Sequence, residues 1–180
     1  DSARILEVRV GVLTMVASID GVETGGEGGL LGLAAHESQL YVYYTTAAGN
    51  RIDRFEITGQ PGDLELENRE TILEDLPSAR YHNGGRIAFG PDGMLYATVG
   101  DAGDTAAAQD VESQAGKILR MPPEGDVPDG NPFADSLVYS YGHRNPQGLG
   151  WDSEGTMYAS EFGQDTWDEL NVIEAGGNYG

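Results

Sequence analysis

The chain has 180 residues, of which 30 are acidic and 10 are basic, giving a formal net charge of −20. Such a field repels nucleic acid and anionic lipid, so we expect neither as a partner. The sequence contains no cysteine, which excludes disulfides and thiolate chemistry, and no apolar run approaches the roughly 20 residues needed to span a bilayer.

Three stretches of the chain share one pattern. Each has a short alternating apolar run, a polar turn and a second run with a tyrosine, at Tyr41, Tyr96 and Tyr158. Alternation closed by glycine, aspartate or proline predicts strands joined in hairpins. A hairpin that recurs at this spacing is typical of a β-propeller with long connecting loops, while a β-sandwich is the alternative. The stretches are residues 30–43, 87–99 and 149–160.

The repeats predict an all-β fold of about three blades, each a four-stranded antiparallel sheet, in one partial propeller domain over residues 1–180. A propeller needs at least four blades to close, so we expect an incomplete propeller whose first and last blades leave apolar side chains uncovered. Residues 105–117 are the one stretch for which a short helix is predicted.

The acidic residues are distributed along the chain, and Lys117 is the only lysine. An ordinary acidic protein is one explanation. We expect a salt-adapted, halophilic protein, because the Debye length falls from about 10 Å at 0.1 M salt to about 3 Å at 1 M and the charges then repel one another less.

His82 lies in the segment 81–86, Tyr-His-Asn-Gly-Gly-Arg, directly before the second repeat. Two consecutive glycines allow positive φ or a close backbone approach. A neutral imidazole is the natural general base near pH 7, and Asp101, at the end of the same hairpin, is placed to hold its far nitrogen. Taken alone, a surface or loop histidine is the commoner explanation.

A second cluster, residues 141–148, precedes the third repeat and holds His143, Arg144 and Asn145. The planar guanidinium of Arg144 suits bidentate binding of a carboxylate or quinone oxygen. The alternative is a polar turn held by Asn145 and Pro146, in which His143 supports the loop.

A third cluster, residues 160–169, contains carboxylates at Glu161, Asp165, Asp168 and Glu169. Calcium prefers six to eight oxygen ligands, so the cluster suits a hard cation, although its spacing is not that of an EF-hand loop. A solvated acidic loop is the alternative.

Taken in order, five segments resemble the soluble glucose/sorbosone dehydrogenase family, six-bladed β-propellers that use pyrroloquinoline quinone (PQQ) and calcium. The similarity covers nearly all of residues 22–180, and it depends on the order and spacing of the segments rather than on any one motif. The segments are residues 26–34, 76–86, 116–120, 141–148 and 168–180.

The resemblance implies an oxidoreductase of carbohydrate metabolism that oxidises the C1 hydroxyl of an aldose, with hydride transfer to PQQ. His82 corresponds to the general base and Asp101 to the carboxylate beside it. Arg144 is implied to stabilise the charge that forms on the quinone. Arg144, Asn145 and Glu27 correspond to residues that contact the cofactor.

Five further residues correspond to calcium ligands of the family. Gly163 and Gln164 fall where backbone carbonyls face the calcium that sits on the cofactor. Asp168, Glu169 and Tyr179 match a region that binds a structural calcium. The family likeness also implies a sugar substrate, an external electron acceptor and export from the cytoplasm, and it leaves the oligomeric state open.

Three departures from the family pattern stand out. Glu27 occupies a position where glutamine is usual, and a carboxylate there faces an anionic quinone unfavourably. Gln164 replaces a proline, a change that a carbonyl ligand survives. The chain ends at Gly180 before the family's later blades, so we expect the chain by itself to be inactive. A calcium-dependent sugar lactonase and a non-enzymatic binding propeller are the competing hypotheses.

Overall fold

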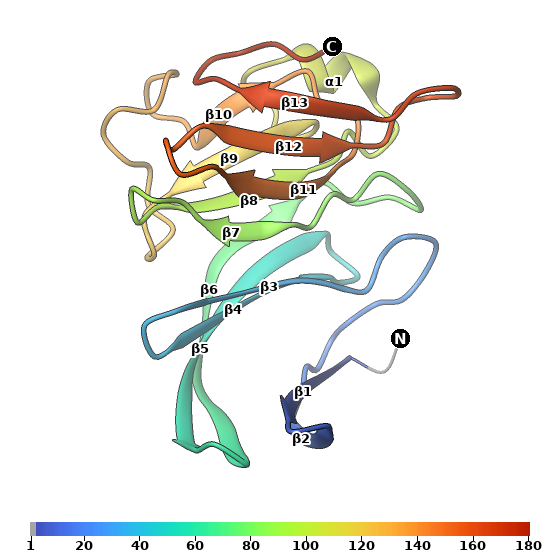
Figure 1. The fold of residues 1–180 in the computed structure, drawn as a ribbon. Helices are drawn as coiled ribbons and strands as arrows, with labels where there is room; N and C mark the ends of the chain where they lie inside the picture. The colour runs from blue at the N-terminus through green and yellow to red at the C-terminus, as the bar shows by residue number, and fades with distance from the viewer. Residues whose placement is uncertain (1–2) are drawn as a thin grey trace.

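The computed structural model describes residues 3–180, which fold almost entirely into antiparallel β-structure (Figure 1). Within this range there are a two-stranded hairpin, two four-stranded sheets and a three-stranded sheet, each with its strands in chain order. The strands of the first half are β1 Arg4–Arg9, β2 Val12–Ser18, β3 Leu30–His36, β4 Gln39–Thr45, β5 Asn50–Gln60 and β6 Asp63–Leu76. The later elements are β7 Ile87–Phe89, β8 Leu95–Val99, α1 Thr105–Gln109, β9 Lys117–Met121, β10 Val138–Tyr141, β11 Pro146–Trp151, β12 Met157–Glu161 and β13 Glu169–Ile173.

The three larger sheets follow one another as blades of a β-propeller. Each begins with its innermost strand, and these inner strands are neighbours in space: β3 contacts β7, and β7 contacts β11. In Figure 1 the sheet β3–β6 lies below the other two, and β11–β13 lies in front of β7–β10. The predicted all-β, partial-propeller architecture is confirmed.

The three predicted hairpins are the inner pairs of the blades, β3–β4, β7–β8 and β11–β12. Tyr41 and Tyr96 occupy the second strand of their hairpins and are 1% and 4% exposed. The turn of the second hairpin has the predicted chemistry: Gly93 has a φ of 75°, and its N–H donates to the carbonyl of Gly90 across Pro91 and Asp92 at 3.0 Å.

Apolar cores fill the spaces between the sheets. Between the first and second blades, Tyr43 and Leu119 are completely buried. Between the second and third, Ile118 packs with Met157. Burial of a leucine or isoleucine side chain contributes about 1.5–3 kcal/mol, so these contacts are sufficient to fix the blades against each other.

Two of the predictions about individual elements are wrong in detail. Helix α1 ends at Gln109 instead of reaching residue 117, because Asp110 is extended and its carboxylate accepts the N–H of Glu112 in a local turn. The third blade has three strands in the described range, whereas four were expected.

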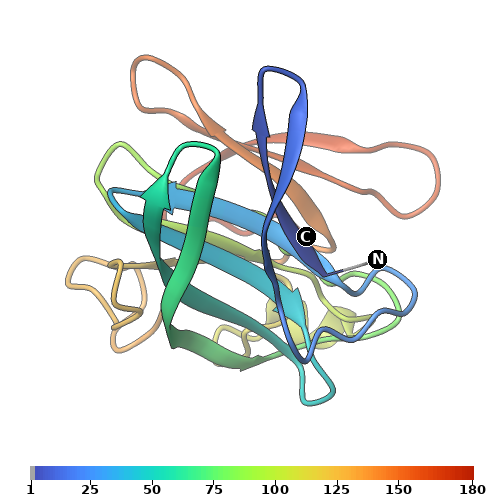
Figure 2. The same ribbon diagram turned by 90° about the horizontal axis from the view of Figure 1, so that it is seen from below.

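The hairpin β1–β2 was not predicted. Ile5 of β1 packs with Val42 and Phe55 on the first blade, so the hairpin covers that blade on the side away from the second one. Seen from below, it crosses the sheet β3–β6 (Figure 2).

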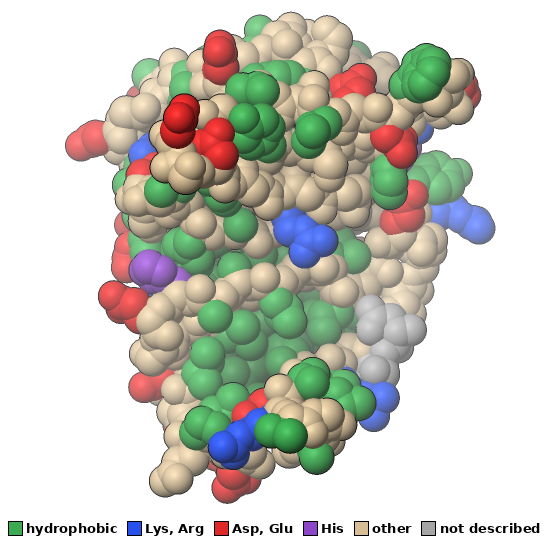
Figure 3. Space-filling model, in the orientation of Figure 1, with side chains coloured by type: hydrophobic (Ala, Val, Ile, Leu, Met, Phe, Trp, Pro, Cys, Tyr) green, Lys and Arg blue, Asp and Glu red, His purple; other side chains and the backbone are tan. Residues whose placement is uncertain are grey.

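Apolar side chains are exposed at both ends of the stack, but at the first end those with the largest exposure belong to the hairpin β1–β2 and not, as had been expected, to the first blade. Val8 and Leu13 of the hairpin are 70% and 64% exposed, and Leu170 of β13 is 74% exposed. Figure 3 shows hydrophobic side chains gathered between the hairpin and the first blade. No helix within residues 3–180 is long and apolar enough to cross a membrane.

Candidate active site

The predicted site residues come from equivalent places in successive blades. Glu27 lies in the loop before β3, His82 in the loop before β7, and Arg144 and Asn145 in the loop before β11. Because the inner strands are neighbours, the loops that enter them meet at one end of the stack.

His82 is held by its backbone and by its ring. Its φ is 61°, in the left-handed region that non-glycine residues rarely adopt. Its carbonyl accepts the N–H of Ala102 at 3.2 Å, and its Nδ1 lies 2.7 Å from Oδ1 of Asp101. Asp101 is 2% exposed and also accepts the N–H of Gly103 at 2.7 Å. The imidazole is therefore oriented with Nε2 free of this contact.

The two glycines after His82 permit this geometry. Gly84 and Gly85 have φ values of 65° and 98°. A Cβ on Gly84 would lie 2.6 Å from the carbonyl oxygen of Thr98, and one on Gly85 would lie 2.6 Å from Cβ of Leu31. The glycine pair is therefore required both for its φ values and for close packing.

Arg144 is attached to the same framework. Its carbonyl accepts the N–H of Asp101 at 2.8 Å, its N–H donates to Glu161 Oε1 at 2.8 Å, and its Nη1 donates to the carbonyl of Phe162 at 3.1 Å. His82, Asp101 and Arg144, which are distant in sequence, thus lie side by side.

These three residues line one cavity of about 560 Å³, together with Gln164 and residues of the α1 segment such as Gln109. This volume falls within the usual range of ligand pockets, about 300–1,000 Å³. A larger cavity of about 810 Å³ lies elsewhere, beside Glu112 and Phe133, and no predicted site residue lines it. By size alone, the larger cavity would be the candidate active site. We choose the smaller one, because it contains the hydrogen-bonded pair His82 and Asp101.

Glu27 and Asn145 do not line this cavity. Oε2 of Glu27 accepts the backbone N–H of His82 at 2.7 Å and Nδ2 of Asn145 at 3.2 Å. The Asn145 amide is 1% exposed, and its Oδ1 accepts the N–H of Gly84 at 3.0 Å. The two side chains tie the three loops to one another, and their predicted contact with a cofactor stays a prediction.

The predicted metal ligands are only partly gathered. Gln164 reaches the cavity, and the N–H of Gly163 donates to Oδ1 of Asp168 at 3.2 Å. Glu169 accepts from Asn171. Within residues 3–180, no group of three or more His, Asp or Glu side chains is placed to hold a metal ion.

Tyr179 is engaged away from the two carboxylates of the predicted structural calcium site. Its hydroxyl donates to the carbonyl of Val172 and accepts the N–H of Glu174, both at 2.7 Å. Its ring stacks on His143, with ring centroids 5.0 Å apart.

Sequence reasoning missed Glu161 by grouping it with the acidic loop. It is 4% exposed and lies at the end of β12, where Met157 and Ala159 are also buried. The period-two alternation along this strand places Glu161 on the buried face, and that signal was available in the sequence.

Lys117 adds a positive charge beside the cavity. It is fully buried, and its Nζ donates to the carbonyls of Ala107 at 3.0 Å and Ala108 at 2.9 Å, and also to that of Ala115. Ala108 lines the cavity. Burial lowers the pKa of Lys117 to about 8, against the attraction of Asp110, which raises it.

Comparison with known proteins identifies the family. The model of the family "Glucose / Sorbosone dehydrogenase" matches residues 2–180. The chain belongs to this family. Among curated members, quinoprotein glucose dehydrogenase B of Acinetobacter calcoaceticus is 32% identical over 88% of the chain and 40% of the relative. Aldose sugar dehydrogenase YliI of Escherichia coli K12 is 29% identical over 94% of the chain and 50% of the relative.

A solved member of the family has the same fold. The PQQ-bound aldose sugar dehydrogenase of Streptomyces coelicolor is 50% identical and superimposes with a TM-score of 0.93, over 99% of this chain and 56% of that one. The chain therefore spans about half the length of the family members that it matches.

Proposed function

We propose that the protein is a PQQ-dependent sugar dehydrogenase that oxidises the C1 hydroxyl of an aldose. The single observation that carries the proposal is the contact between His82 and Asp101, 2.7 Å, in one cavity with Arg144. Family membership supports sugar oxidation, and the names of two relatives, a quinoprotein and a PQQ-bound enzyme, support the cofactor.

The residues of the cavity fit an anionic quinone. Arg144 lines the cavity, Lys117 lies directly behind it, and the volume of about 560 Å³ accommodates a small organic ligand. A protein of net charge −20 needs such local positive groups to hold a polycarboxylate. When bound, PQQ would supply the hydride acceptor.

The chain's own residues then have distinct tasks. Asp101 orients the His82 ring through Nδ1, which leaves Nε2 to take the proton of the sugar hydroxyl. Arg144 is placed to stabilise negative charge that develops on an oxygen in the cavity.

We further propose calcium beside Gln164, with backbone carbonyls of Gly163 and Gln164 as ligands, since carbonyl oxygens suit this cation. Asp168, Glu169 and Tyr179 remain the proposed ligands of a second calcium. An external electron acceptor and export from the cytoplasm belong to the same proposal.

The test replaces the proposed base. His82→Ala, in the longest natural polypeptide that contains residues 1–180, should lower aldose-dependent reduction of an acceptor dye by about 10²–10⁴-fold, because a general base is lost. PQQ binding, followed by fluorescence, should remain. His36→Ala is the matched control: His36 stacks on Phe89, with ring centroids 4.2 Å apart, and does not line the cavity. Equal dye reduction by His82→Ala and His36→Ala would assign the base elsewhere.

A further inference from the structure

At the wall of the cavity, which His143 helps to line, lies a buried set of three polar side chains that the proposed reaction does not use. Ser140 and His143 are fully buried, and Glu161 is 4% exposed. Ser140 Oγ lies 2.8 Å from Nε2 of His143, and Nδ1 of His143 lies 2.8 Å from Oε2 of Glu161. The residues come from β10, the loop after it and the end of β12.

The direction of each hydrogen bond follows from the carboxylate. An ionised carboxylate accepts only, so Nδ1 of His143 carries the proton and donates to Glu161. Nε2 of His143 is then the acceptor, and the Ser140 hydroxyl donates to it. The other oxygen of Glu161 accepts the backbone N–H of Arg144 at 2.8 Å. With a neutral imidazole, this arrangement gives each buried side-chain polar atom of the set a hydrogen-bond partner.

The contact with Arg144 links the buried set to the cavity. The carbonyl of Arg144 accepts the N–H of Asp101, and Asp101 holds the ring of His82. One chain of contacts therefore leads from Glu161 through Arg144 and Asp101 to the proposed base. A second contact, from the N–H of Phe162 to the carbonyl of Asn145 at 3.3 Å, fixes the same two segments.

The set has the connectivity of a Ser–His–acid hydrolytic triad, but its burial excludes that role. A nucleophile must reach the substrate, whereas Ser140 has no exposed surface. Tyr179 stacks on His143 and covers one face of the ring, with an interplanar angle of 13°.

We propose that Glu161 is a positioning residue, which fixes the Arg144 backbone against Asp101 by accepting hydrogen bonds from Arg144 N–H and His143 Nδ1 together. An effect of Glu161 on catalysis, through Arg144 and Asp101, rests on the proposed function. The positioning of the Arg144 backbone does not. The backbone N–H of Arg144 can only donate, whereas Nδ1 of His143 can donate or accept, depending on the tautomer of the ring. The tautomer of His143 therefore reports whether residue 161 accepts from it or donates to it.

The first test compares Glu161→Leu with Glu161→Gln. In Glu161→Leu, the amide of Arg144 should exchange with deuterium at least about tenfold faster, because its hydrogen bond to a charged group is lost. The amide of Asp101 should also exchange faster, because its acceptor, the carbonyl of Arg144, is no longer held in place. In Glu161→Gln, the amide oxygen still accepts from Arg144, and exchange should stay near the wild-type rate. Glu154→Leu and Glu154→Gln, at an exposed turn of the same hairpin, are the controls. Unchanged exchange in a folded Glu161→Leu would overturn the proposal.

The second test also decides the question if Glu161→Leu does not fold. ¹⁵N NMR of the His143 ring should show the Nδ1–H tautomer in the wild type and the Nε2–H tautomer in Glu161→Gln, where the new amide N–H donates to Nδ1. The same tautomer in both proteins would overturn the proposal, because it would mean that residue 161 does not set the polarity of the bond to His143 Nδ1.

The third test separates this proposal from the proposed function. Glu161→Leu should weaken PQQ binding, measured by fluorescence, at least about tenfold, and Glu161→Gln should restore it. If the wild-type protein binds no PQQ, the proposed function fails, and the exchange rates still decide the role of Glu161. Covalent labelling of Ser140 by a fluorophosphonate would overturn the positioning role by showing an accessible nucleophile.

Discussion

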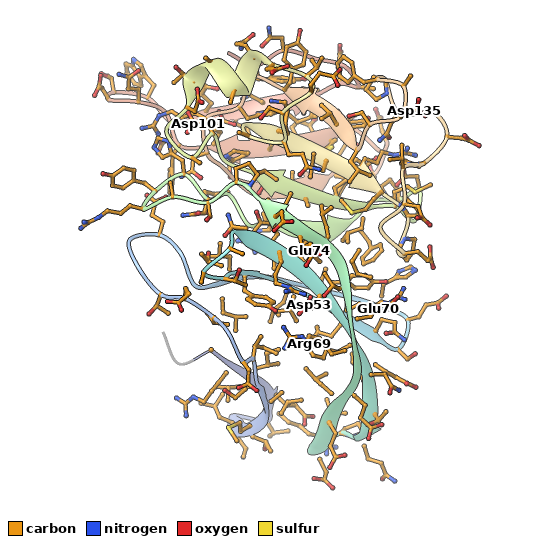
Figure 4. The ribbon with its side chains drawn as sticks, turned by 180° about the vertical axis from the view of Figure 1, so that it is seen from behind. Asp53, Arg69, Glu70, Glu74, Asp101 and Asp135 are labelled. Carbon is orange, nitrogen blue, oxygen red and sulfur yellow. The ribbon has the colours of Figure 1, made fainter. Side chains whose placement is uncertain are left out.

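Two buried carboxylates, Asp53 in the first blade and Asp101 at the cavity, are stabilised in different ways. Asp53 has no exposed surface and pairs with Arg69 at 2.7 Å and Arg51 at 3.0 Å. It also accepts the hydroxyl of Tyr44 at 2.6 Å. Figure 4 shows Asp53 and Arg69 together inside the first blade and Asp101 at the far end of the stack, near α1.

Within residues 3–180 the carboxylate of Asp101 forms no ion pair with an arginine, although its backbone N–H donates to the carbonyl of Arg144. Its side chain accepts from the ring of His82 and the N–H of Gly103. Asp53 pairs with guanidinium groups from two strands of one sheet and therefore serves the fold, whereas Asp101 holds the ring of a histidine that lines the cavity. Both carboxylates are buried, so burial does not distinguish the one at the cavity from the one that serves the fold. The side chain that each carboxylate binds, a histidine or two arginines, makes the distinction.

Removing Asp53 should produce the largest loss of stability. Asp53→Ala leaves two guanidinium groups and the Tyr44 hydroxyl without their acceptor, and should lower the free energy of unfolding by about 3 kcal/mol. This is the low end for a broken buried pair, because the Arg69 side chain is 40% exposed and can reach water. Urea denaturation measures the effect. Glu65→Ala on the same hairpin should change stability by less than about 0.5 kcal/mol.

For Asp101 we expect a smaller effect on stability and a larger effect on turnover than for Asp53. Asp101→Ala should cost less stability than Asp53→Ala but lower turnover by about 10–100-fold, since the bond that orients His82 is lost. A large loss of stability with normal turnover would show that Asp101 serves the fold in the same way as Asp53.

Lys117 should make stability depend on pH. Its folded pKa of about 8 lies below the ordinary value of 10.5, so between these values the unfolded chain binds more protons. The stability of the wild type, relative to Lys117→Met, should therefore rise from pH 8 to pH 10, by about 1–2 kcal/mol. Urea denaturation of both proteins at pH 7, 8, 9 and 10 measures this. A constant difference across these values would show that the lysine does not titrate in this range.

At higher pH, Tyr44 should make stability fall as the pH rises, which is opposite to the effect of Lys117. Burial, and then the bond and charge of Asp53, raise its pKa to about 12, so its unfolded form ionises first above about pH 10. Stability should fall there in both proteins. Taking the difference between wild type and Lys117→Met at each pH removes this contribution.

High salt should stabilise the protein as a whole. At net charge −20, NaCl at 2 M should raise Tm by at least about 3 °C relative to 0.1 M, which for a chain of this size corresponds to about 1 kcal/mol. The loss caused by Asp53→Ala should persist, because buried pairs are screened less. NaCl is preferred to sulfate, which strengthens apolar burial in any protein. Equal Tm values at the two salt concentrations would contradict the salt-adapted interpretation.

The smallest effect is expected at Glu27. Its carboxylate is exposed and accepts both of its hydrogen bonds through one oxygen, so the amide oxygen of Glu27→Gln can accept them as well. If the proposed anionic quinone binds in the cavity, the substitution removes one negative charge near it and should tighten PQQ binding less than about fivefold. Fluorescence titration at low salt measures the change, with Glu23→Gln, in the same loop, as control. Weaker PQQ binding by Glu27→Gln would show that the charge itself is required.

The sequence was sufficient to predict the inner hairpins of the three blades and several of the residues that line the cavity. Alternating runs, Pro91-Asp92-Gly93 and the glycine pair before Arg86 depend on local chemistry, which a sequence displays directly. The family likeness brought His82, Asp101 and Arg144 together, although they are distant along the chain.

Other features depended on tertiary contacts. Helix α1 ends before residue 117 because the carboxylate of Asp110 accepts the N–H of Glu112 in a local turn. The alanine run before Asp110 gives no indication of where the helix ends. Glu161 is a different case, because the alternation of buried positions along β12 indicates its burial and its place in an acidic segment concealed that signal. The cluster around Asp53 joins β4, β5 and β6, and its partners are fixed by strand pairing that the sequence alone does not specify.

The burial of Lys117 has a practical consequence for handling the protein. It is the only lysine of the sequence, and its ammonium group is enclosed by backbone carbonyls. Amine-directed reagents, such as succinimidyl esters used for surface immobilisation or cross-linking mass spectrometry, would find no lysine at the surface of the folded chain. Coupling through the many exposed carboxylates is the effective route for attaching this protein to an electrode or a resin.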